Sequence, residues 1–222
     1  MARHKFLVAG EWRDSKEILE VRSPYDGKLV GTTFRPTEGD VEDAVNAAVN
    51  AAGETGSLPT YKRSEILRNI QNGIVRRREE FAKTITLEAG KPVKDSRREV
   101  ERAAHLIGLA AEEVKRTGGE LFPLDLLESA KGYVALTRRF PLGPILGITP
   151  FNFPINLVCH KLAPAIAGGN AIIIKPTSAT PLTALLLAEV VRESGLPAAA
   201  LSVLPCDTAV AAGGTHASAR PR

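Results

Sequence analysis

The residues best suited to chemistry in this 222-residue chain lie in two short loops, each following an apolar segment. The first loop covers residues 149–154, where Asn152 stands between two prolines that restrict the backbone. The Asn152 amide offers two donors, and donors held beside a carbonyl stabilise the oxyanion that forms when the carbonyl is attacked. The alternative is that Asn152 only caps the helix that follows.

The second loop covers residues 175–178 and follows the β-branched run at 171–174. Lys175 and the hydroxyls of Thr177 and Ser178 form a group suited to a ribose or a phosphate. The alternative is a lysine that simply reaches water at the end of a strand. No G-x-G-x-x-G pattern follows either apolar segment, so a dinucleotide would be held without the usual glycine-rich loop.

The elements that carry these loops alternate along the second half of the chain. Apolar strands are predicted near 145–148, 171–174 and 201–204, with helices at 154–167 and 181–194 between them. Continuously apolar strands separated by helices are typical of an α/β fold with a parallel sheet covered on both faces. Right-handed connections then bring the carboxyl ends of all three strands to one edge, where such sheets bind ligands.

The first half of the chain is predicted to supply strands, then helices, then a ribbon. Residues 1–35 contain short strands with turns, and four helices follow. Thr37 and Asp40 have the spacing of a capping box at the start of the first helix, and Gly90 before a Lys-Pro pair is expected to end the third. Two extended segments follow, near residues 121–122 and 133–140, and the alternation in the second favours an exposed β-ribbon over residues 120–141.

Two segments taken together resemble a known family. Pro-Phe-Asn-Phe-Pro at 150–154 and Lys-Pro-Thr-Ser-Ala-Thr-Pro at 175–181 are similar to the NAD(P)-dependent aldehyde dehydrogenase superfamily. The resemblance extends over most of residues 5–207. It implies a partial doubly wound cofactor-binding domain over residues 1–207, with the ribbon at 120–141 as an oligomerisation arm.

The resemblance also implies an activity and a set of roles. It implies oxidation of a small aldehyde to a carboxylic acid, with NAD or NADP, through a thiohemiacetal on a cysteine. Asn152 would be the catalytic oxyanion amide. The residues expected along the cofactor are Ile148, Thr149, Pro150, Phe151, Asn152, Lys175, Thr177 and Ser178. Those expected in the substrate tunnel are Phe153, Leu157 and His160. An intact parent protein would be a homodimer or a homotetramer.

One position bears on the choice of cofactor. Many NAD-preferring members of the superfamily carry a glutamate where this chain has Ser178. A carboxylate there would repel the 2′-phosphate of NADP, whereas a hydroxyl would not. The sequence therefore favours NADP over NAD.

The chain has only two cysteines, which give no disulfide framework and no metal-binding pattern. A reducing compartment, the cytoplasm, is therefore expected. Cys159 lies inside a predicted helix and is interpreted as a buried thiol, and Cys206 follows the last strand with no base near it in sequence. Neither matches the family's nucleophile, and the family's general-base glutamate has no counterpart, so this chain is predicted to be inactive.

Two hypotheses about the origin of the chain follow. The first is a dehydrogenase whose sequence is truncated or shifted in frame near residue 210. The second is a non-catalytic fragment that binds nucleotide weakly or associates with an intact subunit. Residues 208–222 hold few large apolar side chains, so a disordered and out-of-frame tail is predicted there. The strand at 201–204 would then be left as an open apolar edge.

The overall composition excludes other classes of function. The net charge of +4 comes from scattered basic pairs with acids nearby, which is typical of solvated helix faces. Interleaved aromatic side chains are missing, so no nucleic-acid surface is predicted. No apolar run is long enough for a membrane span.

Overall fold

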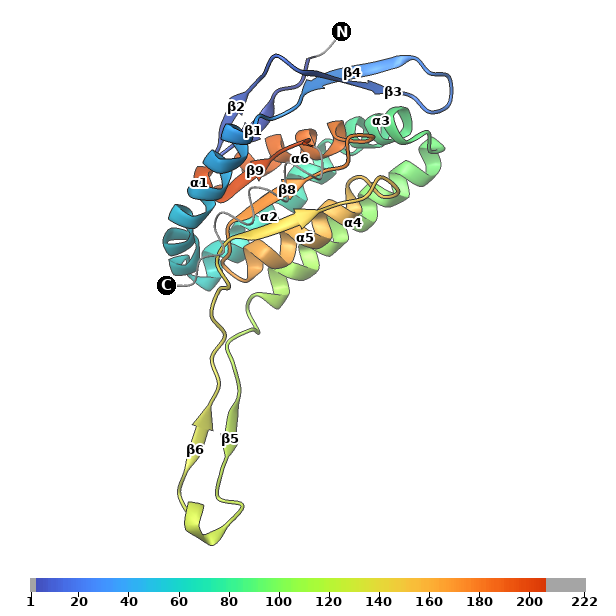
Figure 1. Ribbon diagram of the computed structural model, residues 1–222. Helices are drawn as coiled ribbons and strands as arrows, with labels where there is room; N and C mark the ends of the chain where they lie inside the picture. Colours follow the sequence, from blue (N-terminus) through green and yellow to red (C-terminus); the bar gives the residue numbers. More distant parts are fainter. Residues whose placement is uncertain (1–2, 207–222) are drawn as a thin grey trace.

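The structure is a computed structural model that describes residues 3–206, and within them a five-stranded sheet packs against helices while a long ribbon projects away (Figure 1). The strands are β1 (Phe6–Val8), β2 (Glu11–Arg13), β3 (Ile18–Arg22), β4 (Leu29–Phe34), β5 (Leu121–Pro123), β6 (Val134–Leu136), β7 (Ile145–Ile148), β8 (Ile172–Lys175) and β9 (Leu201–Val203). The helices are α1 (Glu38–Ser57), α2 (Thr60–Arg76), α3 (Arg78–Ala89), α4 (Val93–Glu113), α5 (Asn156–Ala167) and α6 (Leu182–Arg192), with short 3-10 turns η1 (Glu128–Ala130) and η2 (Ala198–Ala200).

The predicted parallel sheet is confirmed. The five strands run in the order β2-β1-β9-β8-β7, and β8 pairs in parallel with both β7 and β9. Ile148 lies opposite Lys175 in this register, and Ile174 lies opposite Val203. The carboxyl ends of three neighbouring strands therefore meet at one edge, as expected for a sheet built with right-handed crossovers.

The prediction that the last strand would be an open edge is wrong. The N-terminal strand β1 pairs with β9 in the antiparallel direction, with Leu7 opposite Val203. This pairing covers β9 on its second side and adds β2 beyond it. The two edge strands of this sheet are instead β2 and β7, and on β7 Leu146 and Ile148 are 38% and 49% exposed. The sheet therefore gives no argument that the fold is cut short at β9.

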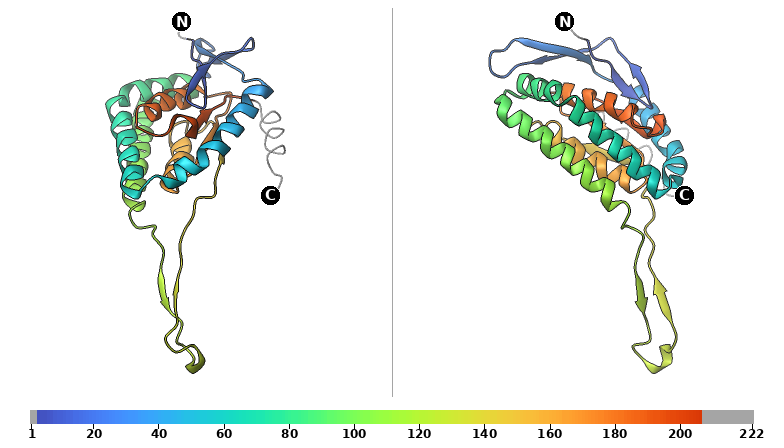
Figure 2. Two further views of the ribbon diagram at one scale, coloured as in Figure 1. Left: turned by 90° about the vertical axis from the view of Figure 1, so that its left-hand side faces the viewer. Right: turned by 180° about the vertical axis from the view of Figure 1, so that it is seen from behind.

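The helices form layers behind the sheet. Helices α5 and α6 connect the parallel strands and contact them, and α2, α3 and α4 pack against α5 and α6 in turn. Figure 2 shows these three helices as the outer layer when the molecule is seen from behind. The apolar core runs through both layers and includes Phe6, Ile70, Phe81, Ile107 and Ile166, all at most 2% exposed.

Several predicted element boundaries are confirmed by local chemistry. The Thr37 hydroxyl accepts from the Asp40 amide, and the Asp40 carboxylate accepts from the Thr37 amide, so α1 begins with the predicted capping box. Gly90 ends α3 in the left-handed conformation, at φ 67°, which glycine adopts at little cost. Helix α5, by contrast, begins at Asn156 and not at the predicted residue 154.

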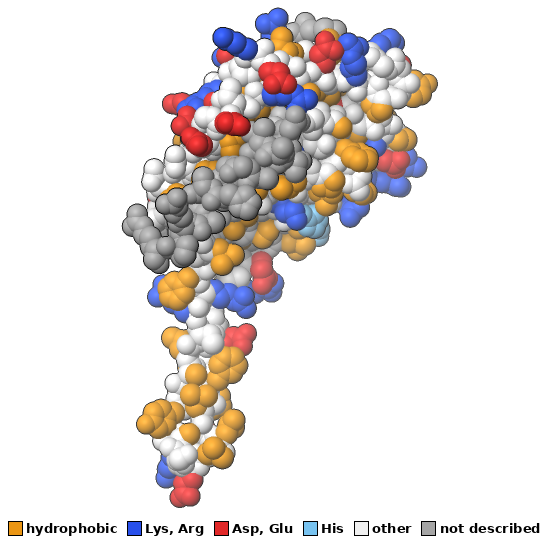
Figure 3. Space-filling view, viewed as in Figure 1, with side chains coloured by type: hydrophobic (Ala, Val, Ile, Leu, Met, Phe, Trp, Pro, Cys, Tyr) orange, Lys and Arg blue, Asp and Glu red, His pale blue; other side chains and the backbone are white. Residues whose placement is uncertain are grey.

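The ribbon of β5 and β6 is exposed, as predicted. Leu121 and Leu136 are paired across the ribbon and are 70% and 75% exposed, and Figure 3 shows apolar side chains gathered along it. Residues 207–222, including the tail predicted at 208–222, lie outside the described residues. Within residues 3–206, every helix is too short or too polar to cross a membrane.

Candidate active site

The structure brings the two loops identified in the sequence side by side. The Thr149 N–H donates to the Lys175 carbonyl over 3.1 Å, so the first loop leaves β7 in register with the end of β8. On the other side of β8, the Leu204 N–H donates to the Ile174 carbonyl over 2.9 Å. The predicted meeting of the loops at the carboxyl edge of the sheet is therefore confirmed.

Asn152 lies exposed in the first loop, and its amide makes no hydrogen bond to any residue of the described chain. The alternative that it caps α5 is wrong, because the first amides of α5 have another acceptor. The Ile155 and Asn156 N–H groups both donate to Glu99 Oε1, over 3.0 and 3.2 Å. The side-chain amide of Asn152 is therefore available to a ligand.

A buried ion pair holds this loop in place. Glu99 is only 3% exposed, and its Oε2 lies 2.5 Å from Lys91 Nζ. The same ammonium lies 4.1 Å from the centroid of the Phe153 ring, which is the residue after Asn152. Lys91 and Glu99 thus contact the loop at Phe153 and at the start of α5. The next amide along the chain, the Leu157 N–H, donates to the Phe153 carbonyl over 3.1 Å, so the helical bonds of α5 start after the two amides that Glu99 holds.

Lys175 does not simply reach into water, so the second alternative is also wrong. The residue is only 6% exposed, and its ammonium forms no ion pair with a carboxylate of residues 3–206. Two hydroxyls between β8 and α6 lack partners: Ser178 makes no side-chain hydrogen bond within the described residues, and Thr180 Oγ1 is buried without one. A buried lysine followed within five residues by unpartnered hydroxyls fits the oxygens of a ribose or a phosphate.

The start of α6, which follows this second loop, is fixed by a second buried glutamate. Glu88 accepts the Leu182 and Thr183 N–H groups over 2.8 and 3.0 Å, and it also accepts from the Thr183 hydroxyl. Burial raises the pKa of Glu88 to about 7, against the effect of these donors and with a smaller contribution from the charge of Glu99. Each candidate loop therefore leads into a helix held by a remote carboxylate.

Apolar side chains lie exposed around the first loop. Ile148, Phe151 and Phe153 are 49%, 63% and 37% exposed. Exposed apolar side chains beside rigid polar groups are typical of small-molecule sites. Ile148 and Phe151, together with Thr149, which is 4% exposed, belong to the predicted cofactor path at the end of β7, whereas Phe153 is one of the predicted tunnel residues.

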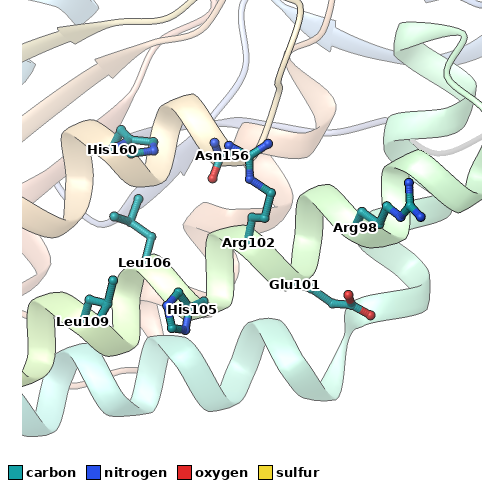
Figure 4. Close-up of a pocket in the computed structure, with 8 residues that line it drawn as sticks. All are labelled: Arg98, Glu101, Arg102, His105, Leu106, Leu109, Asn156 and His160. Atoms are coloured by element: carbon teal, nitrogen blue, oxygen red, sulfur yellow. The ribbon is translucent and has the colours of Figure 1, made fainter.

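A groove of about 470 Å³ lies between α4 and α5 (Figure 4). Of the three predicted tunnel residues, only His160 lines it, while Phe153 and Leu157 do not. Its other lining residues, which sequence analysis missed, are Arg98, Glu101, Arg102, His105, Leu106, Leu109 and Asn156. The spacing of Arg98, Arg102 and Leu106 at every fourth residue of α4 was an available signal, since such residues share one helix face.

Comparison with known proteins agrees with this geometry. The aldehyde dehydrogenase family matches residues 12–217. The chain belongs to the aldehyde dehydrogenase family. It is 43% identical over 207 residues to a 3-sulfolactaldehyde dehydrogenase of Priestia aryabhattai, which covers 93% of this chain and 43% of that protein. It is 33% identical over 206 residues to a mitochondrial succinate-semialdehyde dehydrogenase of Arabidopsis thaliana, covering 92% of this chain and 38% of the relative.

Solved aldehyde dehydrogenases share the fold described above. Aldehyde dehydrogenase 21 of Physcomitrella patens, in complex with succinate, superposes with a TM-score of 0.91 and 38% identity over 96% of this chain. An NADP-dependent glyceraldehyde-3-phosphate dehydrogenase of Bacillus halodurans C-125, complexed with NADP, gives 0.89 and 30% over 96%. These matches cover 45% and 46% of the solved chains, so this chain spans less than half the length of its relatives.

The two thiols of this aldehyde dehydrogenase chain are both buried, which confirms the interpretation of Cys159. Cys159 is 0% exposed and Cys206 is 2% exposed. Burial, with a further contribution from the nearby charge of Glu99, raises the pKa of Cys159 far above the ordinary value of a thiol. A thiol that stays protonated is a poor nucleophile.

Proposed function

We propose that this chain, as a cofactor-binding domain over residues 1–207, supplies the dinucleotide site and the oxyanion amide of an NAD(P)-dependent aldehyde dehydrogenase. The observation that carries the proposal is the hydrogen bond from the Thr149 N–H to the Lys175 carbonyl. This bond places the exposed Asn152 amide and the buried Lys175 at the same edge of the sheet. The residue proposed to bind the aldehyde carbonyl and the residue proposed to bind the dinucleotide therefore lie next to each other.

The candidate site residues have different proposed roles because their side chains differ in chemistry. Asn152 donates to the aldehyde oxygen as negative charge develops there, and its loop is held rigidly by Glu99 and Lys91, which is the condition for such donors to be effective. Lys175, Thr177 and Ser178 bind the ribose or phosphate oxygens of the dinucleotide. Ile148, Thr149, Pro150 and Phe151 lie along it on the first loop. NAD or NADP, when bound, accepts the two electrons that the aldehyde loses.

Turnover also requires a thiolate that attacks the aldehyde. Cys159 and Cys206 are the only cysteines of the 222 residues, and both are buried. Isolated protein of these 222 residues therefore binds nucleotide but does not oxidise aldehydes, and the thiolate that turnover needs lies outside these 222 residues. Thiols that are not needed as disulfides suit a reducing compartment, and we place the chain in the cytoplasm.

The cofactor proposal favours NADP. Ser178 is partly exposed on the loop after β8 and brings no negative charge to the ribose site. A similar solved enzyme is complexed with NADP, and a relative from Streptococcus equinus, 35% identical over 204 residues, is named an NADP-dependent glyceraldehyde-3-phosphate dehydrogenase. NAD remains an acceptable cofactor, because nothing in the loop excludes a free 2′-hydroxyl.

The ribbon supplies the contact between subunits in this proposal. Its apolar side chains are exposed on both strands, and a patch of this kind on a projecting arm is typical of an interaction surface. The assembled protein is then a homodimer or a homotetramer. An isolated chain of this sequence could instead associate with an intact subunit through the same ribbon.

Titration of the 222-residue protein with NADPH and NADH, followed by nucleotide fluorescence, tests the proposed dinucleotide site. We expect saturable binding that Lys175→Met weakens at least about tenfold, the loss of one charge-assisted hydrogen bond. Lys94→Met is the matched control, because Lys94 is exposed on α4, and it should bind as the parent does. Equal binding by both variants would disprove the assignment of Lys175.

An absorbance assay for NAD(P)H with a panel of aldehydes tests the proposal that the isolated protein does not oxidise aldehydes. We expect no product from the purified 222-residue protein. Production of NAD(P)H from any aldehyde would show that one of the buried thiols is activated during turnover, and the assignment of both as structural residues would be withdrawn.

A further inference from the structure

A second pocket lies at the end of the sheet remote from the Asn152 loop, between helix α6 and the hairpin of β1 and β2. It has a volume of about 270 Å³ and is lined by Arg3, His4, Lys5, Trp12, Leu185 and Glu189. We propose that this pocket binds a small aromatic molecule that carries one carboxylate. The proposal is independent of the dinucleotide site, because no lining residue belongs to either candidate loop.

The walls of the pocket are held by packed elements. Strand β2 pairs with β1 and places Trp12 opposite Leu7, and α6 contacts β1. Leu185, Glu189 and Arg192 share one face of α6, because they are spaced at four and three residues. The guanidinium carbon of Arg192 lies 5.6 Å from the centroid of the Trp12 ring, so this face of α6 also contacts β2. The pocket is therefore formed by strand and helix and not by a loose loop.

The charges of the pocket favour a ligand with a single negative charge. Lys5 Nζ lies 2.8 Å from Asp14 Oδ2, and Glu189 Oε2 lies 2.7 Å from Arg77 Nη2, so both of these lining residues already have an ionic partner. Arg3 forms no ion pair and no side-chain hydrogen bond within residues 3–206. The guanidinium of Arg3 is therefore the charge that a ligand can neutralise. A planar guanidinium matches a carboxylate through two parallel hydrogen bonds.

The other lining residues suit an aromatic body of small size. Leu185, which is 1% exposed, and the half-buried Trp12 supply apolar surface. The indole N–H of Trp12 makes no hydrogen bond within residues 3–206, and His4 can donate a ring N–H whether or not it is protonated. Pockets for drug-sized ligands have volumes of roughly 300–1,000 Å³. This smaller pocket therefore fits about one ring with its acid group.

Nuclear magnetic resonance of the 222-residue protein tests this site directly. Trp12 is the only tryptophan of the chain, so its indole N–H gives a single signal at the pocket. The probe is benzoate, and benzyl alcohol is the neutral molecule with the same ring. We expect saturable shifts of the Trp12 indole signal and of His4 Cε1–Hε1 with benzoate, and much smaller shifts with benzyl alcohol. The His160 Cε1–Hε1 signal reports the groove between α4 and α5 and should stay in place.

Two variants separate the proposed contact from general attraction to a basic protein. Arg3→Gln should weaken benzoate binding at least about tenfold, as expected for the loss of a charge-assisted contact. Lys16→Gln removes an exposed positive charge between β2 and β3, outside the pocket, and should bind benzoate as the parent does. Equal binding by the two variants would overturn the proposal.

Three further results would also count against this site. They are an indole signal that benzoate leaves unmoved, equal shifts with benzyl alcohol, and a shift of His160 without a shift of Trp12. NADPH titration of Arg3→Gln should match the parent protein, and a loss of NADPH binding in that variant would assign the pocket to the dinucleotide instead. Failure of the parent protein to bind NADPH would contradict the proposed function and leave the benzoate result as it stands.

Discussion

Glu88, near the end of α3, and Glu99, in the first half of α4, each accept the first amides of a different helix behind the sheet. Glu88 accepts from Leu182 and Thr183 at the start of α6, and Glu99 accepts from Ile155 and Asn156 at the start of α5. Because each helix follows one of the candidate loops, the corner between α3 and α4 fixes both loops at once. A carboxylate at a helix N-terminus also interacts favourably with the helix dipole.

Removing the Glu99 carboxylate should loosen the Asn152 loop. Glu99→Ala leaves the ammonium of Lys91 and two amides without their buried partner, so the free energy of unfolding should fall by about 3 kcal/mol or more. Denaturant titration measures this loss, and hydrogen exchange at the Ile155 and Asn156 amides should become faster. Glu101→Ala, an exposed change on the same helix, should cost less than about 0.5 kcal/mol. Equal stability of the two variants would contradict the proposed clamp.

Glu88 should make stability depend on pH near neutrality. The pKa of Glu88 is raised from 4.5 to about 7 in the folded protein, so between these values the folded state holds a proton that the unfolded state has lost. The contribution of Glu88 to the free energy of unfolding is fully present below about pH 4.5. It is lost as the pH rises to about 7, and the total loss is about 3 kcal/mol. Denaturant titrations between about pH 5 and about pH 8 measure how the free energy of unfolding changes with pH.

Glu88→Gln supplies the comparison for that slope, because glutamine does not titrate and keeps one acceptor oxygen. Its unfolding free energy should vary less with pH over the same interval. The acids whose pKa values are lowered by arginine, such as Glu80 beside Arg77, lose their contribution only in more acidic solution. A slope that is unchanged in Glu88→Gln would assign the pH dependence to another group.

The parts of the fold that sequence analysis predicted are those that depend on neighbouring residues. The capping box of Thr37 and Asp40 and the left-handed Gly90 involve contacts within one turn of helix. The strand and helix order around the two loops follows from local apolar patterns in the same way. The pairing of β1 with β9 was not predicted, because it joins Leu7 to Val203 across nearly the whole chain.

The two loop residues of the site were predicted from the sequence, whereas the residues that support them were not. Asn152 and Lys175 stood out because each polar side chain follows an apolar strand, and the parallel register then brings them together. The roles of Glu88 and Glu99 could not be recognised, because a helical glutamate is usually solvated and its backbone donors here are remote in sequence. Arg102 was missed for a related reason, since basic residues on a helix are usually on its solvated face.

Ser178→Glu should shift the preference between dinucleotides from NADP toward NAD. A carboxylate at this position would repel the 2′-phosphate of NADP and accept hydrogen bonds from the ribose hydroxyls of NAD. We expect the ratio of NADPH to NADH affinity to fall at least about tenfold, as measured by fluorescence titration. Ser178→Gln, which has the same size without the charge, separates repulsion from steric effects. Equal NADPH and NADH affinities before and after the glutamate change would disprove the role of Ser178.

Charged residues on the ribbon should weaken self-association without unfolding the chain. Leu121 and Leu136 are cross-strand neighbours that are 70% and 75% exposed, so the monomer buries little of either side chain and loses little stability when one is replaced. In an assembled dimer or tetramer each would be buried, and Leu136→Lys would place a charge in an apolar contact. Sedimentation velocity should therefore show the parent protein associating with rising concentration and the variant remaining smaller. Tyr25→Lys, 91% exposed on the turn between β3 and β4, should associate as the parent does. A parent protein that is monomeric at every concentration would refute the ribbon as an association surface for this chain.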